Sequence, residues 1–260
     1  MSGGGVTTLS AVNTLTRIDG PGTVRLAVRT SGPLTDKPVL LVHGMGGDHQ
    51  TWRSLAGELR AGGRTVITYD QRGHGRSSRS KSYLLNDFRD DLSFVLDGLG
   101  VGEVDVIGHS LGGQTAIRLA GLDPSRIGKL VLEEIPPMPR HQSDVDEHIV
   151  PFSGVADRVR GLWSTVRYPG PVLRFDHRMS EIVGRQFESI DTAWWESLAQ
   201  LTFPTLVVSG GQRSFLPPRH LVSLADALPD GHFGQVEAGH SVHRDRTREF
   251  NQLVTEFLRN

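Results

Sequence analysis

The pentapeptide Gly108-His109-Ser110-Leu111-Gly112 constrains the fold of this chain more than any other feature of the sequence. It follows an apolar run, Val104 to Ile107, and precedes a segment typical of a helix, Gln114 to Ala120. At a sharp turn between a strand and a helix, a serine flanked by glycines exposes its hydroxyl oxygen as a nucleophile. The motif therefore predicts such a turn, although a glycine-rich connection without any chemistry is the alternative interpretation of a short motif taken alone.

The rest of the chain alternates short apolar runs with helix-like segments. Nearly continuous apolar runs are typical of strands covered on both faces, whereas 25–29 alternates polar and apolar residues like a half-buried antiparallel strand. Strands that alternate with helices indicate a mainly parallel sheet with right-handed crossovers. We therefore expect an α/β fold, with a mostly parallel central sheet flanked by helices. The expected strands are 25–29, 38–42, 65–69, 104–107, 129–132, 204–208 and 233–236, and the expected helices are 51–61, 84–99, 114–122, 221–228 and 247–258.

This alternation is interrupted between residues 136 and 201. The segment is rich in proline and aromatic residues, and we expect a mostly helical insertion, a cap, over 137–202. The core domain would then consist of 1–136 and 203–260. Trp163, Trp194 and Trp195 lie in the insertion, where aromatic side chains either pack the cap or line a pocket for an acyl group. Because adjacent residues of a helix face different ways, at most one of Trp194 and Trp195 would line the pocket.

Composition excludes several classes of protein. The 260 residues include no cysteine, so neither disulfides nor cysteine-based zinc sites are possible. A net charge of −1 argues against a nucleic-acid-binding protein. No apolar stretch approaches the roughly 20 residues that span a bilayer, and residues 1–10 lack the basic and apolar regions of a signal peptide. We expect a cytoplasmic protein with no membrane span.

A serine hydroxyl is a weak nucleophile at neutral pH, so it needs a general base, usually a histidine that an acid orients. His240, one of 11 histidines, is the candidate base. It follows the last expected strand and precedes the last expected helix, and functional residues are concentrated on such loops. The chain order, Ser110 first and His240 near the C-terminus, is the order of hydrolases with this motif.

The tetrahedral intermediate of acyl transfer needs two backbone N–H donors for its oxyanion. The N–H of Leu111, directly after the nucleophile, is one candidate. The second is the N–H of Met45, in the glycine-rich loop that follows the expected strand 38–42. His43 and Gly44 begin this loop, and His43 is expected to buttress it rather than to act in catalysis.

Five elements of the chain, in this order, resemble the α/β-hydrolase fold family, in particular its small bacterial members with a helical cap. The resemblance covers nearly the whole chain and implies that the cap covers the site and shapes the substrate pocket. It also implies that Asp70 and Arg72 are structural. The five elements are His43-Gly44-Met45-Gly46-Gly47, Asp70-Gln71-Arg72-Gly73-His74-Gly75-Arg76-Ser77, Gly108-His109-Ser110-Leu111-Gly112-Gly113, Pro204-Thr205-Leu206-Val207-Val208 and Gly239-His240. The candidates for contact with a substrate are His43, Gly44, His109, Trp163 and Trp194.

The chain departs from the family in its acid. Members usually carry the acid on the loop after the strand 204–208, but residues 209–215 contain no carboxylate. Some members carry it at the end of the strand that follows the nucleophile helix, where this chain has Glu133 and Glu134. Alternation along a strand points the two side chains to opposite sides, so only one reaches the catalytic histidine. By analogy we favour Glu133, with Glu134 as the alternative, and both glutamates being solvated is a third interpretation.

The resemblance implies a serine hydrolase that cleaves a carboxylic ester, thioester or lactone through an acyl-enzyme intermediate. Dehalogenases and epoxide hydrolases of this fold have an aspartate where Ser110 stands, so acyl transfer is expected. The substrate would be a small acyl compound, and we expect its cleavage to need no metal and no cofactor. Three alternative functions use the same triad: a C–C hydrolase, an acyl-transfer cyclase and a perhydrolase. A fourth alternative is a non-catalytic, ligand-binding member of the fold.

Overall fold

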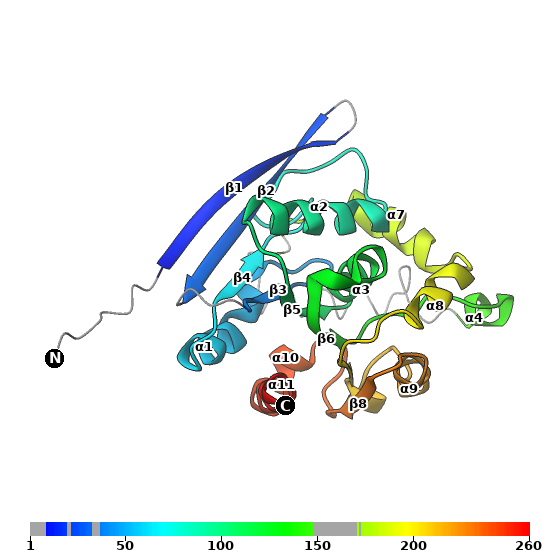
Figure 1. Ribbon diagram of the computed structural model, residues 1–260. Helices are drawn as coiled ribbons and strands as arrows, with labels where there is room; N and C mark the ends of the chain where they lie inside the picture. Colours follow the sequence, from blue (N-terminus) through cyan, green and yellow to red (C-terminus); the bar gives the residue numbers. More distant parts are fainter. Residues whose placement is uncertain (1–8, 20–21, 33–36, 148–170, 172) are drawn as a thin grey trace.

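One eight-stranded sheet forms the centre of the molecule. The computed structural model describes residues 9–19, 22–32, 37–147, 171 and 173–260. The strands are β1 (Leu9–Asp19), β2 (Gly22–Gly32), β3 (Val39–Val42), β4 (Val66–Tyr69), β5 (Val104–His109), β6 (Ile127–Glu133), β7 (Thr205–Ser209) and β8 (Gly231–Gln235). Their order in the sheet is β1-β2-β4-β3-β5-β6-β7-β8 (Figure 1). β1 and β2 are antiparallel to each other, β2 is antiparallel to β4, and the strands from β4 to β8 run parallel.

Helices cover both faces of the sheet. They are α1 (Arg53–Ala61), α2 (Leu85–Gly98), α3 (Leu111–Leu122), α4 (Gln142–Asp146), α7 (Arg178–Phe187), α8 (Thr192–Leu198), α9 (Pro218–Asp226), α10 (Val242–Asp245) and α11 (Thr247–Arg259), and the 3₁₀ turn η1 (His49–Trp52) precedes α1. Figure 1 shows α2 and α3 on one face of the sheet, and α1 and α11 on the other. This layering is the α/β arrangement that the alternating sequence predicts.

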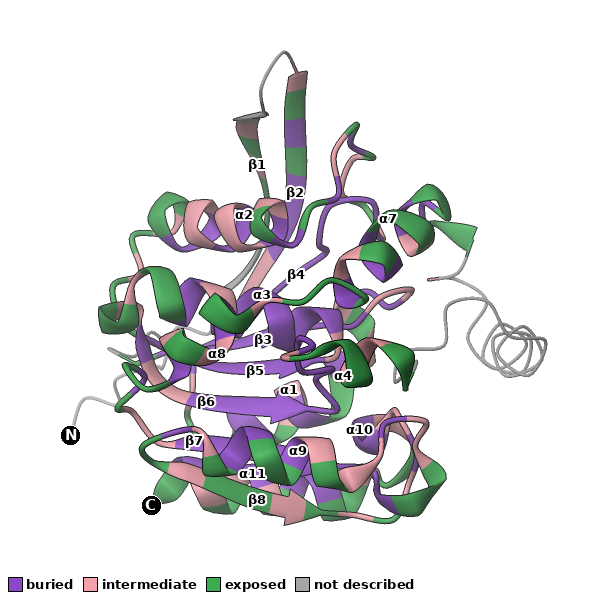
Figure 2. Ribbon diagram, turned by 90° about the vertical axis from the view of Figure 1, so that its right-hand side faces the viewer, coloured by how far each residue is buried: buried purple, intermediate pink, exposed green. Residues whose placement is uncertain are grey.

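Alternation of side chains along the strands divides the core in two. In β3, Leu40 and Val42 belong to the core that α2 and α3 cover, whereas Val39 and Leu41 belong to the core that α1 and α11 cover. Figure 2 shows that the central strands are buried along their whole length. This burial on both faces explains why these strands are continuous apolar runs in the sequence.

The observed elements follow the predicted order, with two informative differences. β1 is not among the predicted strands, because its apolar residues are interspersed with polar ones and form no continuous run, and it pairs on one side only, with β2. α3 begins at Leu111 rather than at the predicted residue 114. Gly112 and Gly113 are poor helix formers, and tertiary packing overrides that low propensity.

Part of the predicted cap is described, and it contacts the core through hydrogen bonds. The hydroxyl of Tyr83 donates to Oδ2 of Asp176 at 2.7 Å, and the N–H of Leu85 donates to Oε1 of Gln186 at 2.8 Å. α4, α7 and α8 lie within the predicted range. Residues 148–170, which include Trp163, lie outside the described residues. The division into core and cap stays a prediction.

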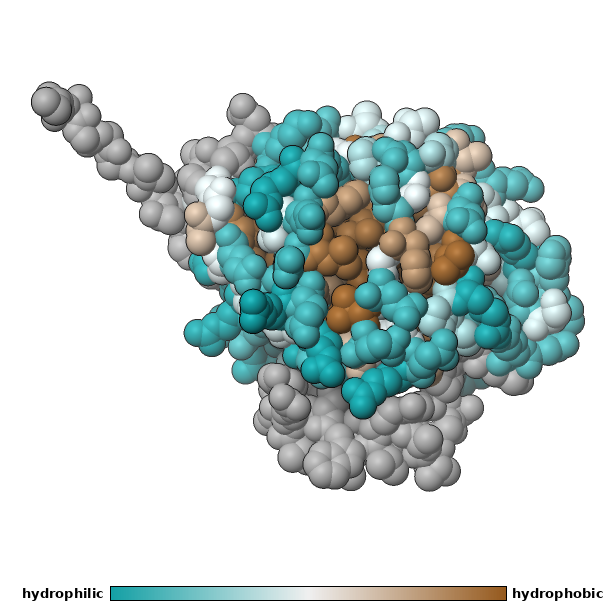
Figure 3. Space-filling view, turned by 90° about the horizontal axis from the view of Figure 1, so that it is seen from below, coloured by the Kyte–Doolittle hydropathy of each residue, from teal (hydrophilic) through white to brown (hydrophobic). Residues whose placement is uncertain are grey.

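β8 forms one edge of the sheet and is more exposed than the central strands, as Figure 2 shows. Its Phe233 side chain is 39% exposed. Figure 3 views the molecule from the side of α9, β8 and α11 and shows an apolar area surrounded by hydrophilic surface.

None of the helices in the described ranges has both the length and the apolar character that a membrane-crossing segment needs.

Candidate active site

Ser110 occupies the sharp turn between β5 and α3. Its φ of 50° and ψ of −114° lie outside the regions that residues with a side chain ordinarily adopt. A Cβ on Gly108 would lie 2.6 Å from the carbonyl oxygen of Gly112, and a Cβ on Gly112 would lie 2.3 Å from that of Val42. The glycines therefore permit the close approach of strand and helix, and the N–H of Ser110 donates to the carbonyl of Glu133 at 2.9 Å. The strained turn that the motif predicts is present.

His240 lies on the loop between β8 and α10, and its ring joins the serine to a carboxylate. Nε2 of His240 is 3.1 Å from Oγ of Ser110, and Nδ1 is 3.1 Å from Oε2 of Glu134. One tautomer satisfies both contacts, because Nδ1–H donates to the carboxylate while Nε2 accepts from the hydroxyl. The side chain of Glu134 is fully buried and that of His240 is 24% exposed, so the base is open to a reactant.

The carboxylate that contacts His240 is Glu134, and the prediction that Glu133 makes this contact is wrong. Glu133 is the last residue of β6 and Glu134 follows it, and their carboxylates contact different histidines, His243 and His240. The φ of Glu134 is 49°, so its backbone leaves the strand in a left-handed conformation. Analogy with the family leads to the end of β6, one residue away from Glu134. It does not indicate which of the two glutamates lies on the side of His240.

The loop after β7 contains no carboxylate, but it holds Glu134 through hydrogen bonds. The N–H of Gly210 donates to Oε1 of Glu134, and the hydroxyl of Ser214 donates to Oε2. The ring centroid of Phe215 lies 4.2 Å from that of His240. The loop 209–215 therefore holds both the glutamate from the neighbouring strand and one face of the imidazole.

Glu133 forms a second buried carboxylate–histidine pair. Its Oε1 accepts the backbone N–H of His243 at 2.9 Å, and its Oε2 lies 2.7 Å from Nδ1 of that histidine. Nε2 of His243 is 2.9 Å from the hydroxyl of Thr51, which also accepts from Nε of Arg244. Burial raises the pKa of Glu133 to about 7 and lowers the pKa of His243 well below its ordinary value. The pair ties α10 to the end of β6, and so fixes the loop that carries His240.

His109, the residue before the nucleophile, holds the same loop from a second side. Its Nε2 is 2.6 Å from the carbonyl oxygen of His240, to which it donates. Burial lowers the pKa of His109 well below its ordinary value, so the ring is neutral at pH 7. A Cβ on Gly44 would lie 2.4 Å from Nδ1 of His109. His109 and Gly44 are predicted to contact a substrate, but the structure packs them against each other.

The loop after β3 is fixed by two buried histidines. Nδ1 of His43 donates to the carbonyl of Gly44 at 2.8 Å, and Nε2 accepts the N–H of Gln71 at 3.1 Å. Nε2 of His74 accepts the N–H of Gly46 at 3.1 Å. Burial lowers the pKa of both rings, that of His74 to about 3. Both ring nitrogens of His43 are engaged with the backbone, so it buttresses the loop and offers no free polar atom to a substrate.

Met45 and Leu111, the two predicted oxyanion donors, lie on the two segments that flank the nucleophile. Met45 is partly buried in the loop after β3, and Leu111 is the first residue of α3. α3 packs against the end of β3 at Gly112, which brings these segments together. The role of the two N–H groups stays a prediction.

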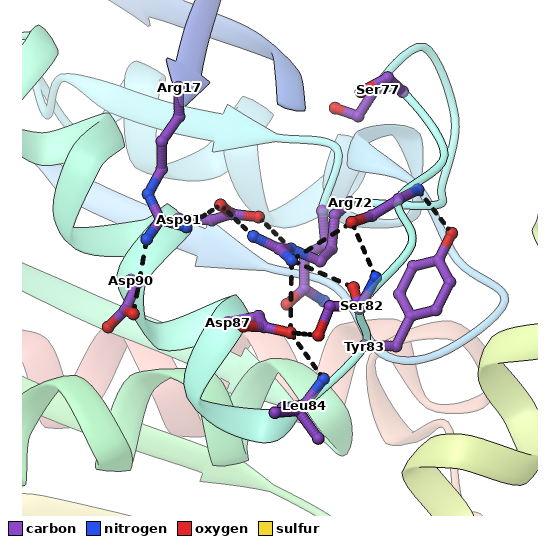
Figure 4. Close-up of polar contacts among 12 residues, drawn as sticks. Arg17, Arg72, Ser77, Ser82, Tyr83, Leu84, Asp87, Asp90 and Asp91 are labelled. Atoms are coloured by element: carbon purple, nitrogen blue, oxygen red, sulfur yellow. Dashed lines mark hydrogen bonds and ion pairs between the residues drawn. The ribbon is translucent and has the colours of Figure 1, made fainter. Parts of the chain in front are cut away.

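A buried arginine holds the loop between β4 and α2, which Figure 4 shows. Nε and Nη2 of Arg72 donate to the two carboxylate oxygens of Asp91 at 2.6 and 2.7 Å. Nη1 of Arg72 donates to the carbonyl of Ser82 at 3.1 Å, and Arg17 donates to Asp91 from β1 at 3.0 Å. Arg72 has no exposed surface. These contacts agree with the structural role that the resemblance implies for Arg72.

The cap tryptophans that are described pack inside the protein. Trp194 is 5% exposed and belongs to the core that α3 covers. Nε1 of Trp195 donates to the carbonyl of Met138 at 2.6 Å, and the guanidinium of Arg140 lies 3.4 Å from its ring centroid. Trp194 therefore packs the cap against the core, the other role that the sequence allows. Trp163 lies outside the described residues.

Three functional neighbours escape prediction from the sequence: His243, Thr51 and Ser214. His243 stands three positions after His240, which is the only signal that it belongs to the site. Thr51 lies in the 3₁₀ turn η1 and Ser214 in the loop after β7, and no motif in the sequence connects them to the two glutamates. Their contacts depend on how distant loops meet at the carboxyl edge of the sheet.

Comparisons with known proteins give one family and a consistent fold. A family model described as alpha/beta hydrolase fold matches residues 37–175. The sn-1-specific diacylglycerol lipase ABHD11 of Mus musculus is 29% identical over 257 residues, which cover 87% of this chain and 82% of that protein. A thermophilic esterase from Thermogutta terrifontis superposes with a TM-score of 0.75 at 25% identity, covering 96% of this chain and 98% of the esterase. A bromoperoxidase from Bacillus anthracis superposes with a TM-score of 0.77 at 21% identity, and the match covers 95% of this chain and 100% of the bromoperoxidase. At that identity the likeness shows only a shared fold.

Proposed function

Because this chain belongs to the alpha/beta hydrolase fold family, we propose that it is a serine hydrolase that cleaves a carboxylic ester, thioester or lactone. The observation that carries the proposal is the unbroken chain of contacts from Ser110 through His240 to Glu134, with both hydrogen bonds at 3.1 Å. A nucleophile, a base and an orienting acid in this arrangement are what acyl transfer requires. The names of the lipase and esterase relatives support the same class of reaction.

The first half of the reaction transfers the acyl group to the enzyme. Oγ of Ser110 attacks the carbonyl carbon as Nε2 of His240 takes the hydroxyl proton. Nδ1–H of His240 stays bonded to Glu134, which stabilises the imidazolium and keeps the ring in the productive tautomer. The imidazolium then gives its proton to the leaving alcohol or thiol, and the acyl group remains on the serine.

The second half releases the acid. Nε2 of His240 takes a proton from a water molecule as the water oxygen attacks the acyl-enzyme carbonyl. The imidazolium then returns that proton to Oγ of Ser110 as the bond between Oγ and the acyl carbon breaks and the acid leaves. In both halves the N–H groups of Leu111 and Met45 would hold the oxyanion of the tetrahedral intermediate. Such donors act without reorganisation when the surrounding loop is rigid, and His43 and His74 fix the loop of Met45 from inside.

Hydrolysis of a p-nitrophenyl ester series, from acetate to decanoate, tests the proposal. We expect the wild type to release nitrophenolate and Ser110→Ala to lose at least about 10³-fold in kcat. Ser189→Ala removes a hydroxyl at the end of α7 and serves as the matched control that keeps full activity. A folded wild type without activity on every ester, or a Ser110→Ala variant as active as the control, would contradict the proposal.

A further inference from the structure

A pocket lined by basic and polar side chains lies on the face of the sheet that α1 covers. Its volume is about 320 Å³, which is at the small end of the range typical of ligand sites in proteins. Three arginines line it, Arg29 from β2 and Arg53 and Arg60 from α1. The other lining residues are Thr30, Ser31, His49, Gln50, Ala56 and Thr68. None of these residues belongs to the proposed triad, although His49 and Gln50 share the turn η1 with Thr51.

Strand register and helix periodicity bring the three guanidinium groups together. Arg29 is the partner of Thr68 in the antiparallel pairing of β2 with β4, so both side chains point to the same face of the sheet. Arg53, Ala56 and Arg60 are three and four positions apart on α1, a spacing that places them along one side of a helix. The small side chain of Ala56 leaves open space between the two helical arginines.

No ion pair balances the charge of these arginines within the part of the chain that the structure describes. In the described part of the chain no carboxylate makes an ion pair with Arg29, Arg53 or Arg60, whereas nearby Arg64 pairs with Asp105 at 2.6 Å. Nη1 of Arg29 is buried and has no hydrogen-bond partner among the described residues. A buried guanidinium N–H without an acceptor is costly, and it is satisfied when a ligand supplies the oxygen.

This positive cluster is a local feature, because the whole chain has a net charge of −1. Asp70, which contacts the lining residue His49, is already engaged, since its Oδ1 accepts the N–H of His49 and lies 2.7 Å from Nδ1 of the same residue. Those bonds and the N–H of Arg76 outweigh the effect of burial and hold the pKa of Asp70 below its usual range. Among the described residues, none supplies an anion to the three arginines, and a bound ligand can supply it.

We propose that this pocket binds the phosphate group of a small phosphate monoester. A phosphate offers about two negative charges and three acceptor oxygens, which match three guanidinium forks better than a single carboxylate does. The pocket is larger than the phosphate group, and the hydroxyl and amide groups of Ser31, Thr68 and Gln50 can bond an attached polar group such as a polyol. The site is separate from Ser110 and does not depend on the hydrolase reaction.

Calorimetric titration with glycerol 3-phosphate tests the site, with inorganic phosphate and glycerol titrated at the same ionic strength. We expect the wild type to bind glycerol 3-phosphate more tightly than inorganic phosphate and not to bind glycerol. The exposed pair Arg53→Ala/Arg60→Ala should weaken the binding at least tenfold. Arg185→Ala/Arg259→Ala removes two exposed charges from α7 and α11, and should bind like the wild type, as should Ser110→Ala.

Three outcomes would overturn the proposal. The first is an absence of binding by the folded wild type. The second is an equal loss of affinity in both arginine pairs, since general electrostatic attraction would explain it. The third is a loss of binding in Ser110→Ala, which would place the ligand in the catalytic cleft. Equal affinities for glycerol 3-phosphate and inorganic phosphate would overturn the choice of a monoester and assign the pocket to free phosphate.

Discussion

Glu134 contacts His240 through Oε2 and Nδ1 at 3.1 Å, although 106 positions separate the two residues in the chain. The residue before it, Glu133, contributes its backbone carbonyl to the N–H of Ser110 and its carboxylate to His243. The end of β6 and the residue after it therefore contact Ser110, His240 and the segment that follows His240. Two adjacent glutamates hold the loop of His240 from two sides, and only Glu134 is in contact with the His240 ring.

The strain at Ser110 should be measurable as stability. Because the φ of 50° is unfavourable for a residue with a Cβ, Ser110→Gly should unfold with a free energy about 1 kcal/mol higher than Ser110→Ala. Urea denaturation of the two inactive variants gives this difference. A Ser110→Ala variant as stable as Ser110→Gly, or more stable, would show that the turn is not strained.

The close packing of α3 against β3 predicts that Gly112 does not tolerate a side chain. A Cβ there would lie 2.3 Å from the carbonyl oxygen of Val42, so Gly112→Ala should lose at least about 3 kcal/mol of stability or fail to fold. Gly57, on α1, is the matched control, since no atom lies within 4 Å of its would-be Cβ. Gly57→Ala should gain about 0.5–1 kcal/mol from helix propensity. Thermal unfolding that moves the two variants in the same direction would contradict this packing.

The buried carboxylate of Glu133 predicts a pH-dependent stability. Its pKa is about 7 in the folded state and near 4.5 when exposed, so the folded state binds more protons between these values. The contribution of Glu133 is therefore most favourable below pH 4.5 and is lost as the pH rises through 7. Relative to Glu133→Gln, the wild type should lose about 3 kcal/mol of unfolding free energy between pH 4.5 and 8. Parallel stability curves for the two proteins would show that Glu133 does not titrate in this range.

The two-pronged contact of Arg72 with Asp91 predicts that lysine cannot replace this arginine. A lysine has no planar fork and cannot make both bonds to Asp91 together with the bond to the carbonyl of Ser82, so Arg72→Lys should cost about 2 kcal/mol of stability. Arg89→Lys changes a partly exposed pair with Asp90 and should stay within about 0.5 kcal/mol of the wild type. Chemical denaturation measures the free energy of unfolding of both variants. Equal losses would contradict a stabilising role for the bidentate contact between Arg72 and Asp91.

The sheet and the nucleophile turn could be predicted from the sequence because the physics that determines them is local. Continuous apolar runs such as Val39–Val42 mark strands buried on both faces, and the glycines around Ser110 mark a turn that only small residues allow. β1 could not be predicted in this way, because an edge strand is stabilised by one partner and carries no apolar run.

The acid illustrates where prediction from the sequence ends. The missing carboxylate at 209–215 points correctly to the end of β6, but choosing between two adjacent glutamates depends on the approach of His240 from a loop far along the chain. The positive φ of Glu134 and the donors Gly210 and Ser214 decide that choice. These are tertiary relationships, and periodicity within one strand contains no information about them.

Comparing kcat for Glu134→Gln and Glu133→Gln on one p-nitrophenyl ester shows which of the two glutamates orients His240. Glu134→Gln should lower kcat by about 10³–10⁴, because an amide does not stabilise the imidazolium of His240. Glu133→Gln should stay within about tenfold of the wild type, because it acts only through His243 on the position of the loop. A larger loss of kcat in folded Glu133→Gln than in Glu134→Gln would contradict the account.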